Sequence, residues 1–364
     1  MAQHSPPSRL TARVVCLPGD GVGPEIIDVA RPLLVSAANR AGITLELLEL
    51  PIGGAGYDAD GDPLPASTEA ACRAADAVLL GAVGAPRYDA LPPALRPEQG
   101  LLRLRRALGV FANLRPVKVY PSLVDRAPLK ASLLEGTDLV VVRELLSGLY
   151  FGEPRGIEGD RAFNTMAYEK SEILRVAEVA FELARTRREA GRPGQVTSVD
   201  KANVLEVSRL WREVVSELQR TRYPDVPLTH QYVDSAAMDL IRRPASFDVV
   251  LTENLFGDIL TDEAAVLAGS IGLLPSASLG AGPGLYEPIH GSAPDIAGRG
   301  VANPIGAVLS AASLLRLSLH LPAEAARLEA AVEAVLEAGH FTADLGGDVS
   351  TAQMGELICR ALND

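Results

Sequence analysis

Two aspartates at helical spacing, Asp258 and Asp262, are the first candidates for chemistry in this sequence. They lie in the run ENLFGDILTD (residues 253–262), which follows the apolar stretch FDVVL (residues 247–251). We expect that stretch to form a buried strand and the run after it to form a turn and a helix. On a helix, the i,i+4 spacing places both carboxylates on one face, where they repel each other unless a cation neutralises them. Because no Cys or His stands here at ligand spacing, a hard cation such as Mg²⁺ or Mn²⁺ is expected, and a solvated acidic helix face is the alternative.

Other charged side chains stand where predicted strands end. Arg143 follows the run DLVVV, Lys201 follows VTSVD and Asp234 follows HQYV. Open α/β sheets bind ligands at the carboxyl ends of their strands, so these side chains are candidates for one site. The same inventory includes Arg105, Arg115 and Tyr150. Arginine forks grip carboxylates bidentately, so the set suits a small dicarboxylate chelated to a divalent metal. Each residue alone also fits a plain surface or packing role.

The elements that must position these residues alternate between strands and helices, which predicts an α/β sheet with parallel pairs. Strands are expected at 13–17, 43–50, 77–81, 138–142, 195–199, 228–233 and 275–279. Helices are expected at 24–38, 66–75, 171–189 with Ser171 as N-cap, 304–320 and 323–338, and at the C-terminus. Residues 280–303 are expected to form a long Gly/Pro loop. Residues 150–157 and 161–168 are predicted to form a hairpin, an arm over about 150–168 that could serve a dimer.

Length and composition narrow the class of protein. A chain of 364 residues predicts two domains, here 1–110 plus 267–364 and 111–266. The net charge of −12 argues against a nucleic-acid-binding surface. Three scattered cysteines, and no predicted leader or membrane span, favour a cytoplasmic enzyme that binds no membrane. The glycines of PGDGVGPE lack the spacing of a dinucleotide-binding Rossmann fingerprint.

Long motifs in order along nearly the whole chain resemble those of one family. They run from PGDGVGPE to TADLGG and include GLLRLRRALGVFANLRPVKVYP, VVRELLSGLYFGEPRG, VTSVDKANVLEVSRLWREV, HQYVDSAAMDL, ENLFGDILTDEAAVLAGSIGLLPSASLG and YEPIHGSAPDIAGRGVANP. The chain thereby resembles the metal-dependent, β-decarboxylating 2-hydroxyacid dehydrogenases, the isocitrate/isopropylmalate dehydrogenase family. The resemblance implies that family's two-domain α/β fold, not a Rossmann fold, with mixed sheets flanked by helices and a projecting β-hairpin arm.

The resemblance also implies an activity and residue roles. The implied reaction is the NAD-dependent, Mg²⁺- or Mn²⁺-dependent oxidative decarboxylation of 3-isopropylmalate to 4-methyl-2-oxopentanoate and CO₂, in leucine biosynthesis. Lys201 would be the base for the substrate hydroxyl, and Tyr150 the acid that protonates the enolate carbon. The carboxylates of the substrate would be held by Arg105, Arg115 and Arg143. The metal would be held by Asp234, Asp258 and Asp262, and Asp234 would also contact the substrate. In the family the residues matching Lys201 and Asp234 come from the neighbouring subunit, which implies a homodimer with shared sites.

Cofactor and substrate preference follow from two further segments. The loop HGSAPD resembles the family's adenosine-binding loop, where Asp295 would accept from both ribose hydroxyls of NAD and repel a 2′-phosphate. The full set of expected cofactor residues is Val22, Glu98, His290, Gly291, Ser292, Ala293, Pro294, Asp295 and Asn303. Leu101 and Leu102 would offer apolar surface to an isopropyl group and leave a third carboxylate unpaired, which disfavours isocitrate and homoisocitrate.

Two alternatives stay open at this point. The chain could be a D-malate or tartrate dehydrogenase of the same family, or a non-catalytic regulatory subunit. It departs from the usual family pattern at Leu146-Ser147, where T-G-G is usual, and at Ala343, where Pro is usual. The first departure lies close to Tyr150.

Overall fold

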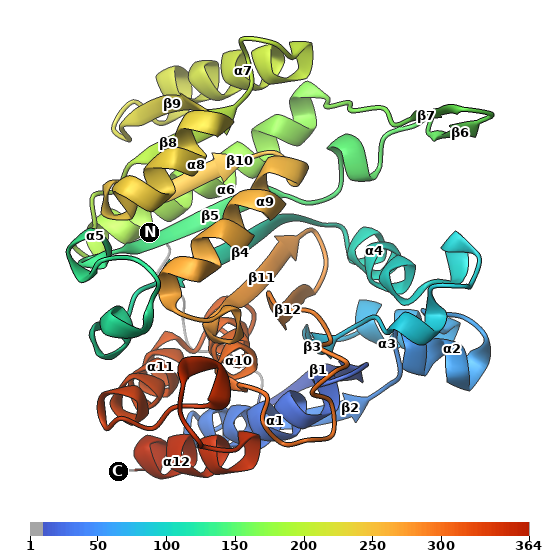
Figure 1. The fold of residues 1–364 in the computed structure, drawn as a ribbon, viewed down its shortest axis with the longest axis vertical. Coiled ribbons are helices and arrows are strands. Elements are labelled where there is room, and N and C mark those ends of the chain that lie inside the picture. The colour runs from blue at the N-terminus through green and yellow to red at the C-terminus, as the bar shows by residue number, and fades with distance from the viewer. Residues whose placement is uncertain (1–9, 364) are drawn as a thin grey trace. The chain divides into compact units, whose positions relative to one another are not determined.

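The computed structural model describes residues 10–363, which divide into two compact units (Figure 1). Unit 1 combines the chain up to Val110 with Tyr120–Arg126 and everything from Ser270 onward, and unit 2 comprises Phe111–Val119 and Ala127–Gly269. The short segment Tyr120–Arg126 belongs to unit 1, whereas the sequence analysis left it in the second domain. Arg126 fixes this segment, because its guanidinium donates to the carbonyl of Leu345 and lies 4.0 Å from the ring centre of Phe341.

The sheet section of unit 1 is mixed. Its strand order is β2 (Thr44–Glu49), β1 (Thr11–Gly19), β3 (Ala77–Ala82), β12 (Gly284–Pro288) and β11 (Pro275–Gly280). All neighbouring pairs here are parallel except β11 with β12. The prediction of a continuous loop over 280–303 was wrong, since β12 lies inside it. This strand is short, is bounded by Gly and Pro, and has all five of its residues buried. It therefore does not show the alternation of polar and apolar residues by which a strand is recognised in a sequence.

Helices cover the sheet section of unit 1. They are α1 (Gly23–Arg40), α2 (Gly54–Asp60), α3 (Ala66–Arg73), α4 (Pro97–Leu108), α10 (Ile305–Leu317), α11 (Pro322–Glu337) and α12 (Thr351–Asn363). The sequence of α10, IGAVLSAASLLRL, is apolar on nearly every side, and the helix is buried against α1, α11 and β12. Such a helix is typical of the interior of a domain rather than its surface.

The sheet section of unit 2 is also mixed, as the sequence predicted. Its order is β4 (Val110–Lys118), β5 (Asp138–Glu144), β10 (Val249–Thr252), β8 (Val196–Asp200) and β9 (Leu228–Tyr232). Only β4 and β5 pair in antiparallel fashion. Because β5, β10 and β8 are parallel, their carboxyl ends meet at one edge, which carries Arg143, Glu253 and Lys201. The sequence analysis missed β4, where Pro116 and two charged residues interrupt the strand pattern.

The helices of unit 2 include α6, whose start differs from the prediction. They are α5 (Ala131–Leu134), α6 (Lys170–Glu189), α7 (Glu206–Arg222), α8 (Val233–Arg242) and α9 (Asn254–Ala265). Ser171 was wrongly predicted as the N-cap of α6. The helix begins one residue earlier, and Glu169 forms a capping box with Glu172, whose carboxylate accepts from the Glu169 N–H at 2.8 Å.

A hairpin projects from unit 2, as expected, but it is shorter than predicted. Strand β6 (Gly156–Glu158) pairs in antiparallel fashion with β7 (Arg161–Phe163), and Figure 1 shows them extending away from the other strands of the unit. Ile157 on β6 is 81% exposed. Within residues 10–363, no helix is long and apolar enough to cross a membrane.

Candidate active site

Helix α9 begins directly after β10 because Glu253 caps it. The carboxylate of Glu253 accepts from the N–H groups of Leu255 and Phe256, at 3.0 and 2.7 Å, and the Tyr168 hydroxyl donates to it at 3.2 Å. These bonds satisfy donors that every helix N-terminus leaves free. Burial raises the pKa of Glu253. The helix places Asp258 and Asp262 one turn apart, which confirms the predicted helical spacing.

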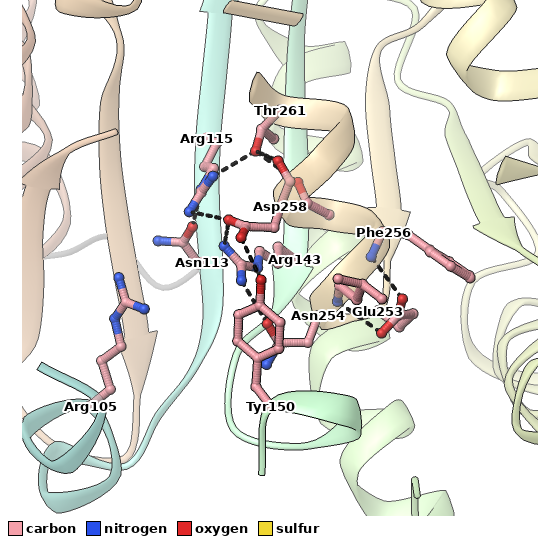
Figure 2. A network of polar contacts seen from close by, with 12 residues as sticks. Arg105, Asn113, Arg115, Arg143, Tyr150, Glu253, Asn254, Phe256, Asp258 and Thr261 are labelled. Atoms are coloured by element: carbon pink, nitrogen blue, oxygen red, sulfur yellow. Dashed lines mark hydrogen bonds and ion pairs between the residues drawn. The ribbon is translucent and has the colours of Figure 1, made fainter. Parts of the chain in front are cut away.

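Three predicted site residues converge on Asp258 (Figure 2). The Arg143 guanidinium donates to one carboxylate oxygen of Asp258, and the Tyr150 hydroxyl donates to the other at 2.6 Å. Arg115 Nη2 lies 3.5 Å from the first oxygen. Arg143 is buried to 2% exposure, and the Asn254 side-chain oxygen accepts from both its Nε and its Nη2, at 3.2 and 2.7 Å. A buried guanidinium is stable only with such partners.

Arg115 is held by neighbours that the sequence reasoning did not identify. Its Nε donates to the Asn113 side chain at 2.6 Å, and its Nη1 donates to the Thr261 hydroxyl at 2.6 Å. In the β4–β5 register Asn113 faces Arg143, so both guanidiniums share one end of the sheet. The available signals were a buried-type strand carrying Asn and Arg, and a Thr placed between the two aspartates of α9.

Asp262 differs from Asp258 because it has no hydrogen bond or ion pair with any residue in the described range 10–363. Partial burial of its carboxylate and the nearby charge of Asp258 hold the pKa of Asp262 above its usual range. The charges of Arg115 and Arg143 offset part of the repulsion within the pair. A divalent cation would relieve what remains, and carboxylate oxygens are the donors that Mg²⁺ and Mn²⁺ prefer. The donor chemistry fits the expected metal.

Lys201 and Asp234 form a separate pair. Lys201 Nζ lies 2.5 Å from Asp234 Oδ1, and this hydrogen bond lowers the pKa of Asp234. Asp234 lies in the first turn of α8 rather than on the preceding strand. No group of three or more His, Cys, Asp or Glu side chains in residues 10–363 is arranged to hold a metal. One chain therefore does not assemble Asp234 with Asp258 and Asp262, and that ligand set stays a prediction.

Tyr150 is positioned by the segment that departs from the usual family pattern. The N–H groups of Leu146 and Ser147 donate to the buried carboxylate of Glu144, and the Ser147 hydroxyl donates to Glu172 at 2.5 Å. Burial raises the pKa of Glu144 to about 7. Burial, followed by the Asp258 hydrogen bond, raises the pKa of Tyr150 to about 12, so the phenol keeps its proton at neutral pH.

Arg105 and Leu101 lie on α4 of unit 1, one turn apart. Arg105 Nη2 donates to Glu287 at 2.7 Å, and both side chains are largely buried. Its Nε is buried and has no hydrogen-bond partner among the residues that the structure describes. Leu101 is half-buried, so part of its apolar surface is accessible.

All of the predicted cofactor residues belong to unit 1. The Val22 N–H donates to the Ser292 carbonyl at 2.8 Å, which joins the loop 290–295 to the start of α1. His290 is half-buried, and burial lowers its pKa, so its ring is neutral; its Nε2 is buried and has no partner within the described residues. Asn303 caps the Ile305 N–H at 3.0 Å, whereas Asp295 is exposed. The unpartnered Nε2 of His290 and the exposed carboxylate of Asp295 thus lie in the loop expected to hold NAD. Both are suited to bind polar groups of a dinucleotide.

One organising residue of unit 1 escaped the sequence analysis. The carboxylate of Asp20, inside PGDG, accepts from the N–H groups of Gly54, Ala55 and Gly84, at 2.8, 2.9 and 2.8 Å. It thereby ties the first turn of α2 and the loop after β3 to the segment that begins α1. An acidic residue between two glycines directly after a strand was the available signal.

Comparison with known proteins defines the class. The model of the isocitrate/isopropylmalate dehydrogenase family matches residues 13–358, so the chain belongs to this family. It is 57% identical over 369 residues to the 3-isopropylmalate dehydrogenase of Synechococcus sp. (strain CC9605), covering 100% of this chain and 98% of that protein. It is 56% identical over 358 residues to the enzyme of that name from Anaeromyxobacter dehalogenans (strain 2CP-C), covering 97% and 100%.

Solved structures support the same fold. The isocitrate dehydrogenase of Methylococcus capsulatus matches with a TM-score of 0.85 at 33% identity, covering 97% of this chain and 100% of that one. A β-decarboxylating dehydrogenase of Thermococcus kodakarensis matches with a TM-score of 0.80 at 37% identity, covering 97% and 96%. These matches confirm the predicted fold class and family.

Proposed function

We propose that this chain catalyses the NAD-dependent oxidative decarboxylation of 3-isopropylmalate to 4-methyl-2-oxopentanoate and CO₂, a step of leucine biosynthesis. The observation that carries the proposal is the convergence of Arg115, Arg143 and Tyr150 on Asp258, in a chain whose full-length relatives bear the name of this activity. An ordinary surface acid would not gather two buried guanidiniums and a tyrosine hydroxyl.

When the substrate binds, its carboxylates would replace the protein carboxylate that pairs with Arg115 and Arg143 in this structure. Arg115 and Arg143 each direct one nitrogen at the Asp258 carboxylate, and a guanidinium can grip a substrate carboxylate through two nitrogens. On unit 1, the unpartnered Nε of Arg105 supports a carboxylate-binding role for that residue. Leu101, one turn earlier, would contact the isopropyl group, and each buried CH₂ contributes about 0.8 kcal/mol.

Asp258 and Asp262 would hold Mg²⁺ or Mn²⁺, with Asp234 of a second copy as the third carboxylate. The bound cation supplies positive charge that stabilises the developing enolate oxygen. The raised pKa of Asp262 fits this role: burial is its main cause, and the nearby Asp258 carboxylate adds a repulsion that a cation would relieve.

The proton transfers fall to Lys201 and Tyr150. Lys201 Nζ would accept the proton of the substrate hydroxyl as the C2 hydride leaves, and bound NAD supplies the acceptor for that hydride. Loss of the neighbouring carboxylate as CO₂ leaves an electron pair in the enolate. The Tyr150 hydroxyl, protonated at neutral pH, would then deliver its proton to the enolate carbon.

A homodimer would complete the site. Exposed apolar side chains on α8, on α9 and directly after α9 support it: Met238, Ile259 and Val266 are 55%, 58% and 46% exposed. Ile259 and Val266 flank Asp262 at helical spacing, so a partner that covers them would also reach the metal-binding face. For the cofactor, the exposed carboxylate of Asp295 supports NAD over NADP, because it would repel a 2′-phosphate. The cytoplasmic location stays a prediction from cysteine usage, and all three cysteines are free.

The test is the rate of NADH formation with 3-isopropylmalate, D-malate, D-tartrate and isocitrate side by side, with and without EDTA. We expect metal-dependent turnover that is strongest for 3-isopropylmalate. A preference for D-malate or tartrate would keep the chemistry and overturn the substrate. The absence of turnover on all four would overturn the proposal in favour of a regulatory subunit.

A further inference from the structure

We propose that Arg212 of α7 is a positioning residue that ties down the two strand ends carrying Lys201 and Asp234. This inference deepens the proposed function and rests on it, since it assigns Arg212 to the alignment of Lys201, the proposed proton acceptor, with Asp234, a proposed metal ligand. Arg212 itself is not placed against substrate, metal or cofactor. Its role would be exerted through Asp200 on one strand and Tyr232 on the next.

The first contact is a two-pronged ion pair with Asp200. Asp200 ends β8, stands directly before Lys201 and is 1% exposed. Arg212 Nε donates to its Oδ2 and Arg212 Nη2 donates to its Oδ1, both at 2.9 Å. A buried carboxylate without a cationic partner is strongly unfavourable, so this fork fixes both side chains in one arrangement.

Asp200 passes that constraint to the backbone that carries Lys201. Its Oδ1 also accepts from the Ala202 N–H at 2.9 Å, which closes a tight turn around Lys201. The Lys201 N–H donates to the Ser208 hydroxyl of α7 at 3.1 Å. The peptide group before Lys201 is therefore held directly by α7, and the one after it is held by Asp200, which Arg212 of the same helix grips.

The second contact is with the neighbouring strand. Strand register pairs Asp200 with Tyr232, and the Arg212 guanidinium lies 5.0 Å from the centre of the Tyr232 ring. Tyr232 is the N-cap residue of α8 and stands two positions before Asp234. One guanidinium thus contacts the residue before Lys201 and the strand end before Asp234, while the two functional side chains meet at 2.5 Å.

Within the described chain, the only other basic group within 4.0 Å of the Asp200 carboxylate is His230, whose Nδ1 lies 3.9 Å from Asp200 Oδ2. Burial and the charge of Arg212 hold the pKa of His230 below its usual value, so the ring is neutral at physiological pH. Arg212 is therefore the cation that balances Asp200. Asp200 and Tyr232, which the Arg212 side chain contacts, are not part of the cluster around Asp258.

The test compares Arg212→Gln and Arg212→Lys with Arg220→Gln, a control on the same helix whose side chain is exposed and paired only with Glu217 in the described chain. We expect Arg212→Gln to lower kcat for 3-isopropylmalate by about tenfold or more with little change in KM, since misplaced groups lose rate rather than binding. Arg212→Lys should restore part of that loss, and the control should match the parent. Fluorescence of Trp211, the one tryptophan in the sequence, checks that each variant is folded.

Amide hydrogen exchange gives a readout independent of activity. In folded Arg212→Gln, peptides spanning residues 200–204 and 230–236 should both exchange faster, whereas β10 should exchange as in the parent. Unchanged kcat and exchange, or a change in KM alone, would overturn the inference. If Arg212→Gln does not fold, Arg212→Lys decides by the same criteria. If the parent does not turn over 3-isopropylmalate, the proposed function fails, and the exchange data still decide whether Arg212 positions the pair.

Discussion

Two charged clusters of unit 2 contrast in how they are built. Around Asp258 the basic partners are buried, with Arg143 and Arg115 side chains only 2% and 7% exposed. In the Lys201–Asp234 pair the side chains are 29% and 58% exposed. Buried charges interact strongly and are costly to separate, whereas exposed pairs are screened by water. Removing one partner from the first cluster should therefore destabilise the unit, whereas a change in the second should act mainly on the chemistry.

The largest effect should come from removing the proposed base. Lys201→Met should lower kcat by about 10²–10⁴-fold, because a positioned proton acceptor contributes on that scale. A rate equal to that of the parent would contradict the role of Lys201. Thermal unfolding should be unchanged, since the pair is exposed.

Breaking the buried cluster should act on stability. Arg143→Met leaves the Asp258 carboxylate and the Asn254 oxygen without their main donor, and we expect a loss of about 3 kcal/mol in the free energy of unfolding. Urea unfolding measures it. Arg220→Met, which removes an exposed arginine paired with Glu217, is the matched control and should leave the urea midpoint unchanged. Equal urea midpoints for the two variants would refute the expectation that loss of a buried partner in the Asp258 cluster costs more stability than loss of an exposed arginine.

Tyr150→Phe separates chemistry from stability within the buried cluster. It removes one hydrogen bond to Asp258, worth about 1 kcal/mol, and the proposed proton donor, worth about tenfold or more in kcat. Because the pKa of Tyr150 is about 12, the parent's kcat should show no loss from tyrosine ionisation up to about pH 10. A decline in parent kcat below that pH that is absent from Tyr150→Phe would show that the phenol titrates earlier.

The smallest change in stability is expected for Asp234→Asn. Its partner, Lys201, remains solvated, so the melting temperature should equal that of the parent in the absence of metal. The metal concentration needed for half-maximal activity should nevertheless rise, because one proposed ligand is neutralised. A melting temperature below that of the parent, together with the parent's metal dependence, would contradict the assignment of Asp234 as a metal ligand.

The sequence predicted the residues of these clusters better than it predicted their partners. The i,i+4 spacing of Asp258 and Asp262 follows from local helix geometry, and strand-end positions follow from sheet topology. That Arg143 binds Asp258 depends on how β5 and α9 pack, across a separation of 115 residues. Pairing at that distance leaves no local pattern. For the same reason β12 was overlooked, since its partners β3 and β11 determine that a short Gly- and Pro-bounded segment becomes a strand.

Unit 1 is assembled from both ends of the chain, and this arrangement governs the order in which the protein can fold during synthesis. When the ribosome has made β1, β2 and β3, one edge of β3 still lacks its partner, because β12 begins only at Gly284. An open strand edge is a site of aberrant association. Unit 2, whose residues end at Gly269, is complete before that edge is closed. During synthesis, unit 2 is therefore complete while unit 1 still lacks β12. The open edge of β3 can promote aggregation until the final third of translation.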